Sequence, residues 1–427
     1  MSRSCIDIST VVVVNRLFPM SNKPASELNA APNRKADERL RIHLKSLLIL
    51  TSIFFVNFTS RIILGPLLPV VESEMGLSHA VAGSLFLYIS AGYFFALLGS
   101  GFISSILTHK QTIVFFSLAL GTALIATSMS QGLWGIRIAL FFTGLAAGPY
   151  IASAMSALTA MVPSRHWGKA LAIHELAPNL AFVAAPMVAE TVLLGFSWRK
   201  TFLFLGLVSL LLTFLFARWG RGGAFRGDRP GFASAKSILG KPEFWILVIL
   251  FSLVVGSTLG VFTMLPLFLV SEHGLERSWA NTLISLSRIA SMAVVLIGGW
   301  AVDRFGLKKV LMITTALTGL TTVGLGMASV SWIAAIIFIQ PVVAASFFPA
   351  GLAALSDISS SNERNIVISL AVPISFLMGA GVIPTLIGFI GDISSLARGI
   401  VLIGGLTSAA ALLPQSLKFT VHSHGNL

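Results

Sequence analysis

The sequence predicts an all-α membrane protein with twelve transmembrane helices in two pseudo-symmetric bundles of six. Hydrophobic residues make up 55% of the 427 residues and charged residues only 11%, whereas about a quarter of the residues in a soluble domain are charged. Apolar runs of about twenty residues, which is long enough to cross a bilayer, recur along the chain. Sequence similarity between positions 198 residues apart indicates two related halves.

The apolar runs predict helices at 46–71, 79–106, 111–129, 132–161, 170–194, 201–217, 243–270, 278–302, 310–328, 331–356, 365–390 and 399–415. Between the sixth and seventh runs, residues 218–242 are basic and rich in glycine, which is typical of a linker. We therefore expect an N-terminal bundle at 46–217 and a C-terminal bundle at 243–415. Residues 1–45 and 416–427 are expected to be tails.

The internal repeat is clearest in a charged loop at 299–309, which reads Gly-Trp-Ala-Val-Asp-Arg-Phe-Gly-Leu-Lys-Lys. A partial copy at 101–111 keeps the first glycine and one lysine but has lost the Asp-Arg pair. The same offset relates Glu-Met-Gly-Leu at 74–77 to Glu-His-Gly-Leu at 272–275. Repeats of this kind are typical of transporters built from two related halves.

The loop at 299–309 resembles the signature of the major facilitator superfamily, Gly-x-x-x-Asp-Arg-x-Gly-x-(Arg/Lys)-(Arg/Lys), and fills each of its defining positions. The resemblance covers about residues 46–415. It implies two six-helix halves with a substrate path between them, and a role in conformational change for Gly299, Asp303, Arg304 and Gly306. We expect Asp303 to cap a neighbouring helix N terminus while the basic residues meet lipid headgroups.

Basic residues are unevenly distributed about the predicted helices. Eight of the 29 Lys and Arg lie in residues 1–45. If both termini are cytoplasmic, 22 fall on the cytoplasmic side and four on the opposite side, which is the bias expected of a protein of the cell (inner) membrane. Topology thus accounts for the pI near 10.5, and nucleic-acid binding is not expected.

In the first predicted helix, Asn57 and Arg61 lie one turn apart. A charged residue at membrane depth costs about 2.5–3.5 kcal/mol on insertion scales, and it marks a pathway or a buried partner. In the family that the chain resembles, this helix lines the central path. We expect substrate contact by Asn57 and Arg61, with a structural ion pair of Arg61 as the alternative.

In the fourth helix, Arg137 precedes Gly144 and Gly148, which resembles the family's pattern of an arginine before closely spaced glycines. Arg137 lies away from the centre of its span, so a gating or structural role is expected. The two glycines are expected to allow close helix packing.

The fifth helix carries His174 and Glu175, the best candidates for proton coupling. A carboxyl or imidazole in low dielectric favours its neutral form, while a nearby arginine favours the carboxylate. A substrate that competes for the arginine would therefore couple to protonation. The alternative is an ion pair between Glu175 and an arginine that only holds one conformation.

Further along this helix, the segment Ala181-x-x-x-Ala185-Pro186 resembles the family's antiporter motif Gly-x-x-x-Gly-Pro, with alanines in place of the glycines. Its counterpart in the other half ends at Pro384 and keeps Gly379. Both segments are expected to form bent, tightly packed helices that move during transport.

In the eighth helix, Asn281, Ser285 and Arg288 form one polar stripe on an otherwise apolar cylinder. We expect this stripe to face a wet cavity and to contact substrate, with a structural pair of Arg288 as the alternative. Tyr93 and Tyr150 are expected to pack in the core or at helix interfaces, with hydrogen bonding in the cavity as the alternative.

The balance of charges within the spans favours an anionic substrate. Three arginines stand against Glu175 and Glu190, so at least one positive charge lacks a fixed partner when His174 is neutral. Arginines in helices 1 and 8 also resemble the anion:cation symporter, oxalate:formate and nitrate porter branches. The match is partial, because Ser60 stands where the symporters place an acid, and residues 365–390 contain no basic residue.

The sequence therefore predicts a secondary active transporter, working as a monomer, that moves a small organic anion, expected to be a monocarboxylate, by alternating access with proton coupling. The alternatives are an efflux antiporter for amphiphilic drugs and a non-transporting receptor on the same fold. An enzyme is not expected, because no nucleophile triad or phosphate loop is visible. No cofactor or metal is expected either, and the sole cysteine is Cys5 in the tail.

Overall fold

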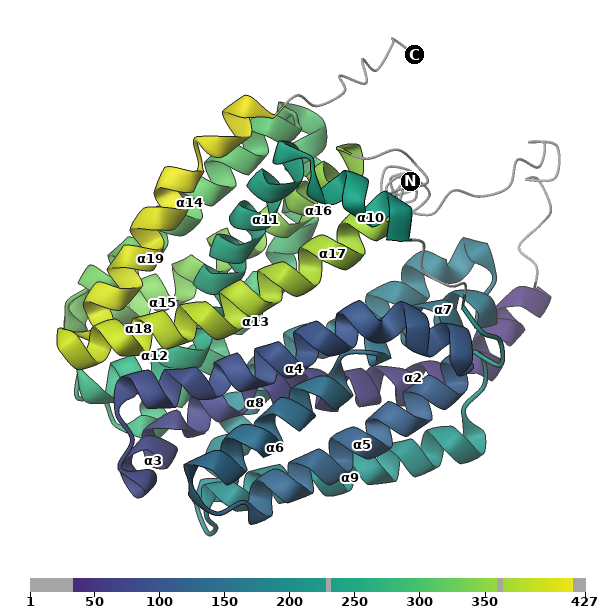
Figure 1. Cartoon of the computed structure of the whole chain (residues 1–427), viewed down its shortest axis with the longest axis horizontal. Coiled ribbons are helices and arrows are strands. Elements are labelled where there is room, and N and C mark those ends of the chain that lie inside the picture. The colour runs from purple at the N-terminus through teal and green to yellow at the C-terminus, as the bar shows by residue number, and fades with distance from the viewer. Residues whose placement is uncertain (1–33, 228–231, 359–363, 418–427) are drawn as a thin grey trace, which may run out of the picture.

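The computed structural model describes residues 34–227, 232–358 and 364–417 (Figure 1). In this part of the chain the secondary structure is entirely helical. The predicted tails 1–45 and 416–427 lie mostly outside the described residues, as do the middle of the linker and residues 359–363.

The N-terminal half begins with α2 (Arg34–Ile62) and α3 (Leu64–Met75), which meet at Ile63 and together form the first span. The next two helices are α4 (His79–Ile106) and α5 (His109–Met129). The fourth span consists of α6 (Gly132–Ala147) and α7 (Tyr150–Met161), which meet at Gly148 and Pro149. The fifth and sixth spans are α8 (Trp167–Leu193) and α9 (Trp198–Trp219).

The C-terminal half follows the short linker helix α10 (Phe232–Leu239). Its spans comprise α11 (Pro242–Val255) with α12 (Val261–Ser271), α13 (Arg277–Phe305), α14 (Leu307–Met327), α15 (Val330–Ala345) with α16 (Phe347–Asp357), α17 (Arg364–Leu377) with α18 (Ile383–Ile393), and α19 (Leu396–Ala410). Two π-helices interrupt these spans, η3 (Gly256–Gly260) between α11 and α12 and η4 (Met378–Val382) between α17 and α18.

The predicted fold class is confirmed. Eleven helices within the described residues are long and apolar enough to cross a membrane. The remaining predicted span corresponds to α13, which is 29 residues long and occupies the eighth position. Figure 1 shows the two halves as separate bundles that lie side by side.

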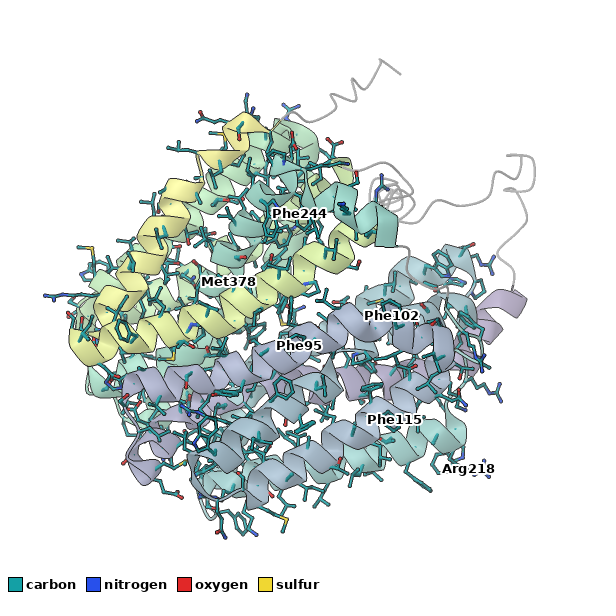
Figure 2. The ribbon with its side chains drawn as sticks, in the orientation of Figure 1. Phe95, Phe102, Phe115, Arg218, Phe244 and Met378 are labelled. Atoms are coloured by element: carbon teal, nitrogen blue, oxygen red, sulfur yellow. The ribbon has the colours of Figure 1, made fainter. Side chains whose placement is uncertain are left out.

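Apolar side chains cover both the interior and much of the outer surface of the molecule (Figure 2). Phe244 is fully buried, whereas Phe95 and Phe115 are 58% and 57% exposed. A surface of this kind is stable against lipid but not against water. The molecule therefore has the surface of a multi-pass membrane protein.

Close backbone approach holds α4 against α6. A Cβ atom on Gly144 would lie 1.9 Å from the Ile89 carbonyl oxygen, and one on Gly92 would lie 2.0 Å from the Phe141 carbonyl oxygen. The predicted packing role of Gly144 is confirmed, and Gly148 is similarly tight, with Ala96 Cβ 2.5 Å from its ideal Cβ position.

The two halves meet at one end of the molecule and diverge toward the other (Figure 1). We call the end that carries α3, α12 and the last turn of α18 the closed end. At this end, a Cβ on Gly83 of α4 would lie 2.5 Å from the Pro384 carbonyl oxygen of α18. We call the opposite end, where residues 218–227 lie against α4 and α5, the linker end.

Candidate functional site

A small open pocket lies between the two halves, roughly midway along the helices, and the space of about 330 Å³ around its lining includes open solvent. The N-terminal half contributes one residue of α2 and four of α4, and the C-terminal half contributes residues of both interrupted spans. Its lining consists of Arg61, Phe86, Ile89, Ser90, Tyr93, Leu259, Thr263, Phe376 and Ala380. Leu259 and Ala380 belong to the π-helices η3 and η4, a type of helix interruption that is frequent at functional sites.

Arg61 carries the only full charge in this lining. Its guanidinium carbon lies 4.2 Å from the centre of the Tyr93 ring and 4.7 Å from that of Phe58. Its Nε atom is buried without a hydrogen-bond partner, and no carboxylate pairs with Arg61 among the described residues. Ring stacking offsets part of the cost of burying the cation but leaves the Nε donor available for an anion.

Arg288 of α13 is buried beside the cavity rather than in its lining. Its guanidinium carbon lies 4.7 Å from the centre of the Phe182 ring and 4.6 Å from that of Phe262. One amino group donates to the Thr258 carbonyl oxygen at 3.2 Å, while Nε has no partner. Arg288 too has no carboxylate partner within the described part of the chain.

A row of aromatic rings connects the two arginines across the interface between the halves. The rings of Phe58 and Phe182 lie 5.1 Å apart, and those of Phe182 and Phe262 lie 4.9 Å apart, each pair edge to face. Arg61 stacks on the first of these three rings, and Arg288 on the other two. The structure thus brings the two predicted arginines to one aromatic cluster.

The other residues predicted to contact substrate are engaged in helix contacts. Asn57 donates to the Ala147 carbonyl oxygen at 2.9 Å, which joins α2 to α6. Ser285 donates to the Val183 carbonyl oxygen at 2.6 Å, which joins α13 to α8 across the interface. None of these predicted residues other than Arg61 lines the cavity.

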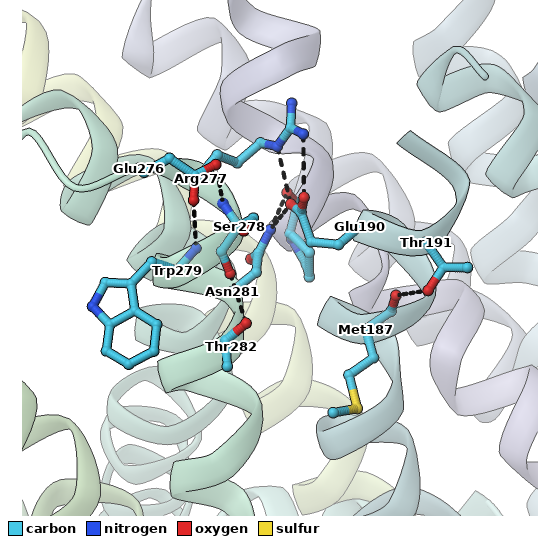
Figure 3. A network of polar contacts seen from close by, with 10 residues as sticks. Met187, Glu190, Thr191, Glu276, Arg277, Ser278, Trp279, Asn281 and Thr282 are labelled. Carbon is cyan, nitrogen blue, oxygen red and sulfur yellow. Dashed lines mark hydrogen bonds and ion pairs between the residues drawn. The ribbon is translucent and has the colours of Figure 1, made fainter. Parts of the chain in front are cut away.

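Asn281 belongs to a polar network at the closed end that joins the two halves (Figure 3). The Glu190 carboxylate of α8 accepts from Arg277 Nε at 3.0 Å and Nη2 at 3.1 Å, and from Asn281 Nδ2 at 2.6 Å. Beside it, Glu276 caps α13 by accepting from the backbone N–H groups of Ser278 and Trp279. These hydrogen bonds lower the pKa of the Glu276 carboxyl.

A second contact between the halves is related to the first by the repeat. Asp392 of α18 accepts from the backbone N–H groups of His79 and Ala80 at 2.8 and 3.0 Å, at the start of α4. The His79 ring lies 2.9 Å from the Glu72 carboxylate. His79 and Arg277 are 198 residues apart and occupy equivalent positions at the start of the second span of each half. Glu190, from the fifth span of the N-terminal half, contacts Arg277, and Asp392, from the fifth span of the C-terminal half, contacts the backbone of His79.

The two predicted proton-coupling residues lie together on α8. His174 is fully buried, with Nε2 3.2 Å from the Tyr150 hydroxyl and Nδ1 3.4 Å from a Glu175 oxygen. The Tyr150 hydroxyl donates its proton to the Leu50 carbonyl oxygen at 2.6 Å, so the hydrogen bond with His174 needs a proton on Nε2.

Glu175 lies on the helix face that points to the other half. It precedes Phe182 by seven residues, or about two turns, and Phe182 packs against Phe262 of the C-terminal half. The Glu175 side chain is half exposed. The His174–Glu175 pair therefore lies on the linker side of the aromatic cluster, on the same face of α8.

The residues predicted to act in conformational change are dispersed along the structure. Asp303 and Arg304 are exposed in the last turn of α13 at the linker end, and Gly306 follows with a φ of 85°. Such a φ is rarely adopted by residues with side chains. Gly299 lies within α13, two turns before Gly306.

Arg137, Pro186 and Pro384 lie in the spans. The Arg137 guanidinium carbon is 5.3 Å from the Tyr88 ring centre and 5.0 Å from that of Trp134. α8 continues as one helix through Pro186, whereas the counterpart at Pro384 directly follows the π-helix η4.

No group of three or more His, Cys, Asp or Glu side chains within the described residues is arranged to hold a metal ion. The cavity offers no carboxylate in its lining. A ligand in the cavity would therefore meet the charged N–H donors of Arg61, the hydroxyl of Ser90 and the faces of aromatic rings.

Sequence reasoning did not identify most of the lining. Phe86, Ser90 and Phe376 are apolar or small residues in long apolar runs, and nothing in their spacing sets them apart. Tyr93 is buried in the core, as expected, and it also lines the cavity against Arg61, which was the alternative. The spacing of Ser90 and Tyr93, one turn apart on α4, is the one signal that was available.

The chain matches the family model of the Major Facilitator Superfamily over residues 50–300 and 272–424. It is 22% identical over 359 residues to the 4-hydroxybenzoate transporter PcaK of Pseudomonas putida, a match that covers 72% of this chain and 80% of PcaK. It is 24% identical over 180 residues to the probable sulfoacetate transporter SauU of Cupriavidus necator, with 42% of each chain covered. The chain therefore aligns with less than half of the length of SauU.

Solved transporter structures share the fold at low identity. A bacterial homolog of the human lysosomal transporter Spinster, in an inward-facing and occupied conformation, superposes with a TM-score of 0.72 at 14% identity, covering 91% of this chain and 97% of that one. The nucleoside transporter NupG superposes with a TM-score of 0.72 at 14% identity, covering 88% and 100%.

Proposed function

Because the chain belongs to the major facilitator superfamily, we propose that it is a secondary active transporter for a small organic anion, expected to be a monocarboxylate. The observation that carries the proposal is Arg61, a cation in the central cavity without a carboxylate partner among the described residues. An unpaired buried charge is costly, and a bound anion would relieve that cost. Relatives named for sulfoacetate and 4-hydroxybenzoate, both organic acids, support this class.

In this proposal Arg61 anchors the substrate in the conformation described here, in which the halves meet at the closed end. Arg288 is shielded by Phe182 and Phe262 and meets the anion only after the halves move. Asn281 with Glu190 and Arg277 then acts as a lock between the halves. Asn57 and Ser285 hold neighbouring helices in register.

Proton coupling is assigned to His174 and Glu175, whose side chains lie 3.4 Å apart on α8. Asp303, Arg304, Gly299 and Gly306 are assigned to the linker-end loop that changes between states, with Arg137, Pro186 and Pro384 supporting helix movement. The protein is proposed to work as a monomer in the cell (inner) membrane, with both termini in the cytoplasm and lipid headgroups around its basic loops.

The test is uptake by proteoliposomes that contain the purified full-length chain. Radiolabelled organic anions, lipophilic cations and neutral amphiphiles are offered with and without an inward proton gradient. Wild type is compared with Arg61→Gln and with the control Arg398→Gln, an exposed arginine outside the cavity.

We expect anions alone to accumulate with the gradient, at least tenfold less in Arg61→Gln and unchanged in Arg398→Gln. Movement of only cations or neutral amphiphiles would instead identify an efflux antiporter. No movement of any solute, with Arg61→Gln behaving like wild type, would leave the receptor interpretation.

A further inference from the structure

We infer that His79, at the start of α4, is a proton-binding site between the two halves, and that its protonation favours the state in which the closed end is shut. The site is separate from the His174–Glu175 pair, which lies on α8 on the linker side of the aromatic cluster. The inference goes beyond the proposed function, because it does not depend on the substrate and can be tested without one. It follows from the carboxylates that surround the His79 ring.

The two contacts across the closed end differ in chemistry. In one, Glu190 pairs with Arg277, whose guanidinium keeps its charge at any ordinary pH. In the other, Asp392 meets the start of α4, where the equivalent position of the repeat is His79. An imidazole changes its charge between about pH 5 and pH 8. The second contact, unlike the first, can therefore respond to pH in this range.

The His79 ring lies between a carboxylate of its own half and the backbone of the other half. Its Nδ1 is 2.9 and 3.0 Å from the two Glu72 carboxylate oxygens of α3. On the opposite edge of the ring, Cδ2 lies 3.2 Å from the position that a Cβ on Gly391 of α18 would take. The next residue, Asp392, accepts from the backbone N–H groups of His79 and Ala80. Closing this end therefore places a second carboxylate beside the ring.

These two carboxylates lack a permanent cation of their own. Within the described residues, neither Glu72 nor Asp392 pairs with a lysine or an arginine. With a neutral His79 ring, closing the end therefore brings two negative charges together, whereas a protonated ring attracts both. The His79 and Glu72 side chains are 27% and 15% exposed, so solvent screens these interactions only in part.

The other charged groups on the elements around this ring have partners elsewhere. Glu74 of α3 accepts from the Arg199 guanidinium, and Glu272 caps α19 through backbone N–H groups. Arg398 of α19 donates to the Ser394 hydroxyl. Among the described residues, the two carboxylates beside the imidazole are thus the charges that decide how tightly it holds a proton.

The direction of the effect follows from these charges. The ring has one carboxylate neighbour, Glu72, when the closed end is open, and two when it is shut. It therefore binds a proton more tightly in the shut state, and by linkage its protonation favours that state. This stabilisation is present while the ring is protonated, and it is lost as the pH rises and the ring becomes neutral. In the proposed orientation the closed end faces the outside, so acid on that side favours the state in which the cavity opens toward the cytoplasm.

The experiment follows the closed end by the distance between two spin labels on the purified full-length chain, without substrate, from about pH 8 to about pH 5.5. The labels are placed at Gln131 and Ser329, which are exposed at the closed end of the N-terminal and C-terminal halves, with Cys5 replaced by serine. The same series is measured in a Glu190→Gln background, which lacks the other ion pair across this end and should populate the open state more.

Three variants change the charges of the site. His79→Gln cannot take up a proton, His79→Arg carries the permanent charge of its repeat counterpart, and Asp392→Asn removes the carboxylate of the other half. The matched control is His273→Gln, which removes a histidine at the same end whose ring packs on Phe268 of its own half.

We expect the ratio of shut to open molecules to rise about threefold or more on acidification in wild type and in His273→Gln, which is the size expected of a half-exposed ion pair. The ratio should change little with pH in His79→Gln and in Asp392→Asn. In His79→Arg it should stay at or above the acid value of wild type throughout.

Two results would overturn the inference. One is a ratio that does not rise on acidification with His79 present, in the wild-type or the Glu190→Gln background, and the other is full pH dependence in His79→Gln. Glu175→Gln should keep the pH dependence, because its carboxyl lies outside this site. Loss of the pH dependence in Glu175→Gln, with His79→Gln behaving like wild type, would place the responsible proton on α8 instead.

Discussion

Glu190 of the N-terminal half and Arg277 of the C-terminal half form a bidentate ion pair that joins the halves at the closed end. Asn281 adds a third hydrogen bond to the same carboxylate. Both charged side chains are largely buried, with exposed fractions of 16% and 33%. The pair is therefore expected to stabilise the closed end more than an exposed ion pair would.

Glu190→Gln should shift the protein toward states in which the closed end is open. The loss of a half-buried pair costs about 1–2 kcal/mol, between the values for exposed and buried pairs, so the ratio of states should change about tenfold. The measurement is the distance distribution between spin labels at Ser73 and Ser271, both exposed at this end, with Cys5 replaced by serine. Glu276→Gln, which removes a nearby carboxylate without breaking a contact between the halves, is the control and should leave the distances unchanged.

Arg288→Gln should impair transport more than binding. Arg288 lies outside the cavity lining in this conformation, so the affinity measured in detergent should change by less than about threefold. The transport rate should fall at least tenfold, because the charge is needed once the halves move. Equal losses in both measurements would place Arg288 in the same binding step as Arg61.

Glu175→Gln should uncouple transport from the proton gradient. The amide of Gln cannot take up and release a proton as the Glu175 carboxyl can. The expected result is counterflow exchange close to that of wild type with no stimulation by an inward proton gradient. Glu243→Gln, at the start of α11 and outside the cavity, should keep the stimulation, and a Glu175→Gln protein that is still driven by the gradient would argue against this site.

Asp303→Asn should slow transport with little loss of ligand affinity. Asp303 is exposed at the linker end of α13, far from the cavity lining, so its effect is expected on the change between states. Initial uptake rates and ligand affinity measured on the same preparation test this. An unchanged transport rate would contradict the assignment.

Gly144→Ala should destabilise the fold. The added Cβ would lie 1.9 Å from the Ile89 carbonyl oxygen, so α4 and α6 must move apart, which costs about 1–3 kcal/mol or more. The melting temperature in detergent should fall by several degrees. Gly405→Ala, a helical glycine with no atom within 4 Å of the added Cβ, should melt like wild type.

The spans and the two-fold repeat could be predicted from the sequence because apolar length and internal similarity do not depend on how helices face one another. The central arginines could be predicted for the same reason, since a charge in an apolar run stands out. The environment of Asn281 and Ser285 could not. Their stripe on α13 is polar, but hydropathy cannot distinguish a stripe that faces water from one that hydrogen-bonds a neighbouring helix.

The cavity lining was beyond prediction for a related reason. Ser90 of α4 is nearly 300 residues from Phe376 of α17 and Ala380 of η4 in the sequence, and only packing in three dimensions makes them neighbours. The sequence predicted the cation in the cavity but not the walls around it.

The π-helices η3 and η4 set the direction in which the lining of the C-terminal half points. Each such segment adds one residue to a turn, and in an α-helix one residue corresponds to a rotation of about 100°. Deleting a single residue between Gly256 and Gly260 would therefore swing either Thr263 out of the cavity or Glu272 away from the start of α19, which it caps through the N–H groups of Leu396 and Ala397. The number of residues in these short segments thus fixes the rotation of the following helix, so that Thr263 faces the cavity while Glu272 reaches the start of α19.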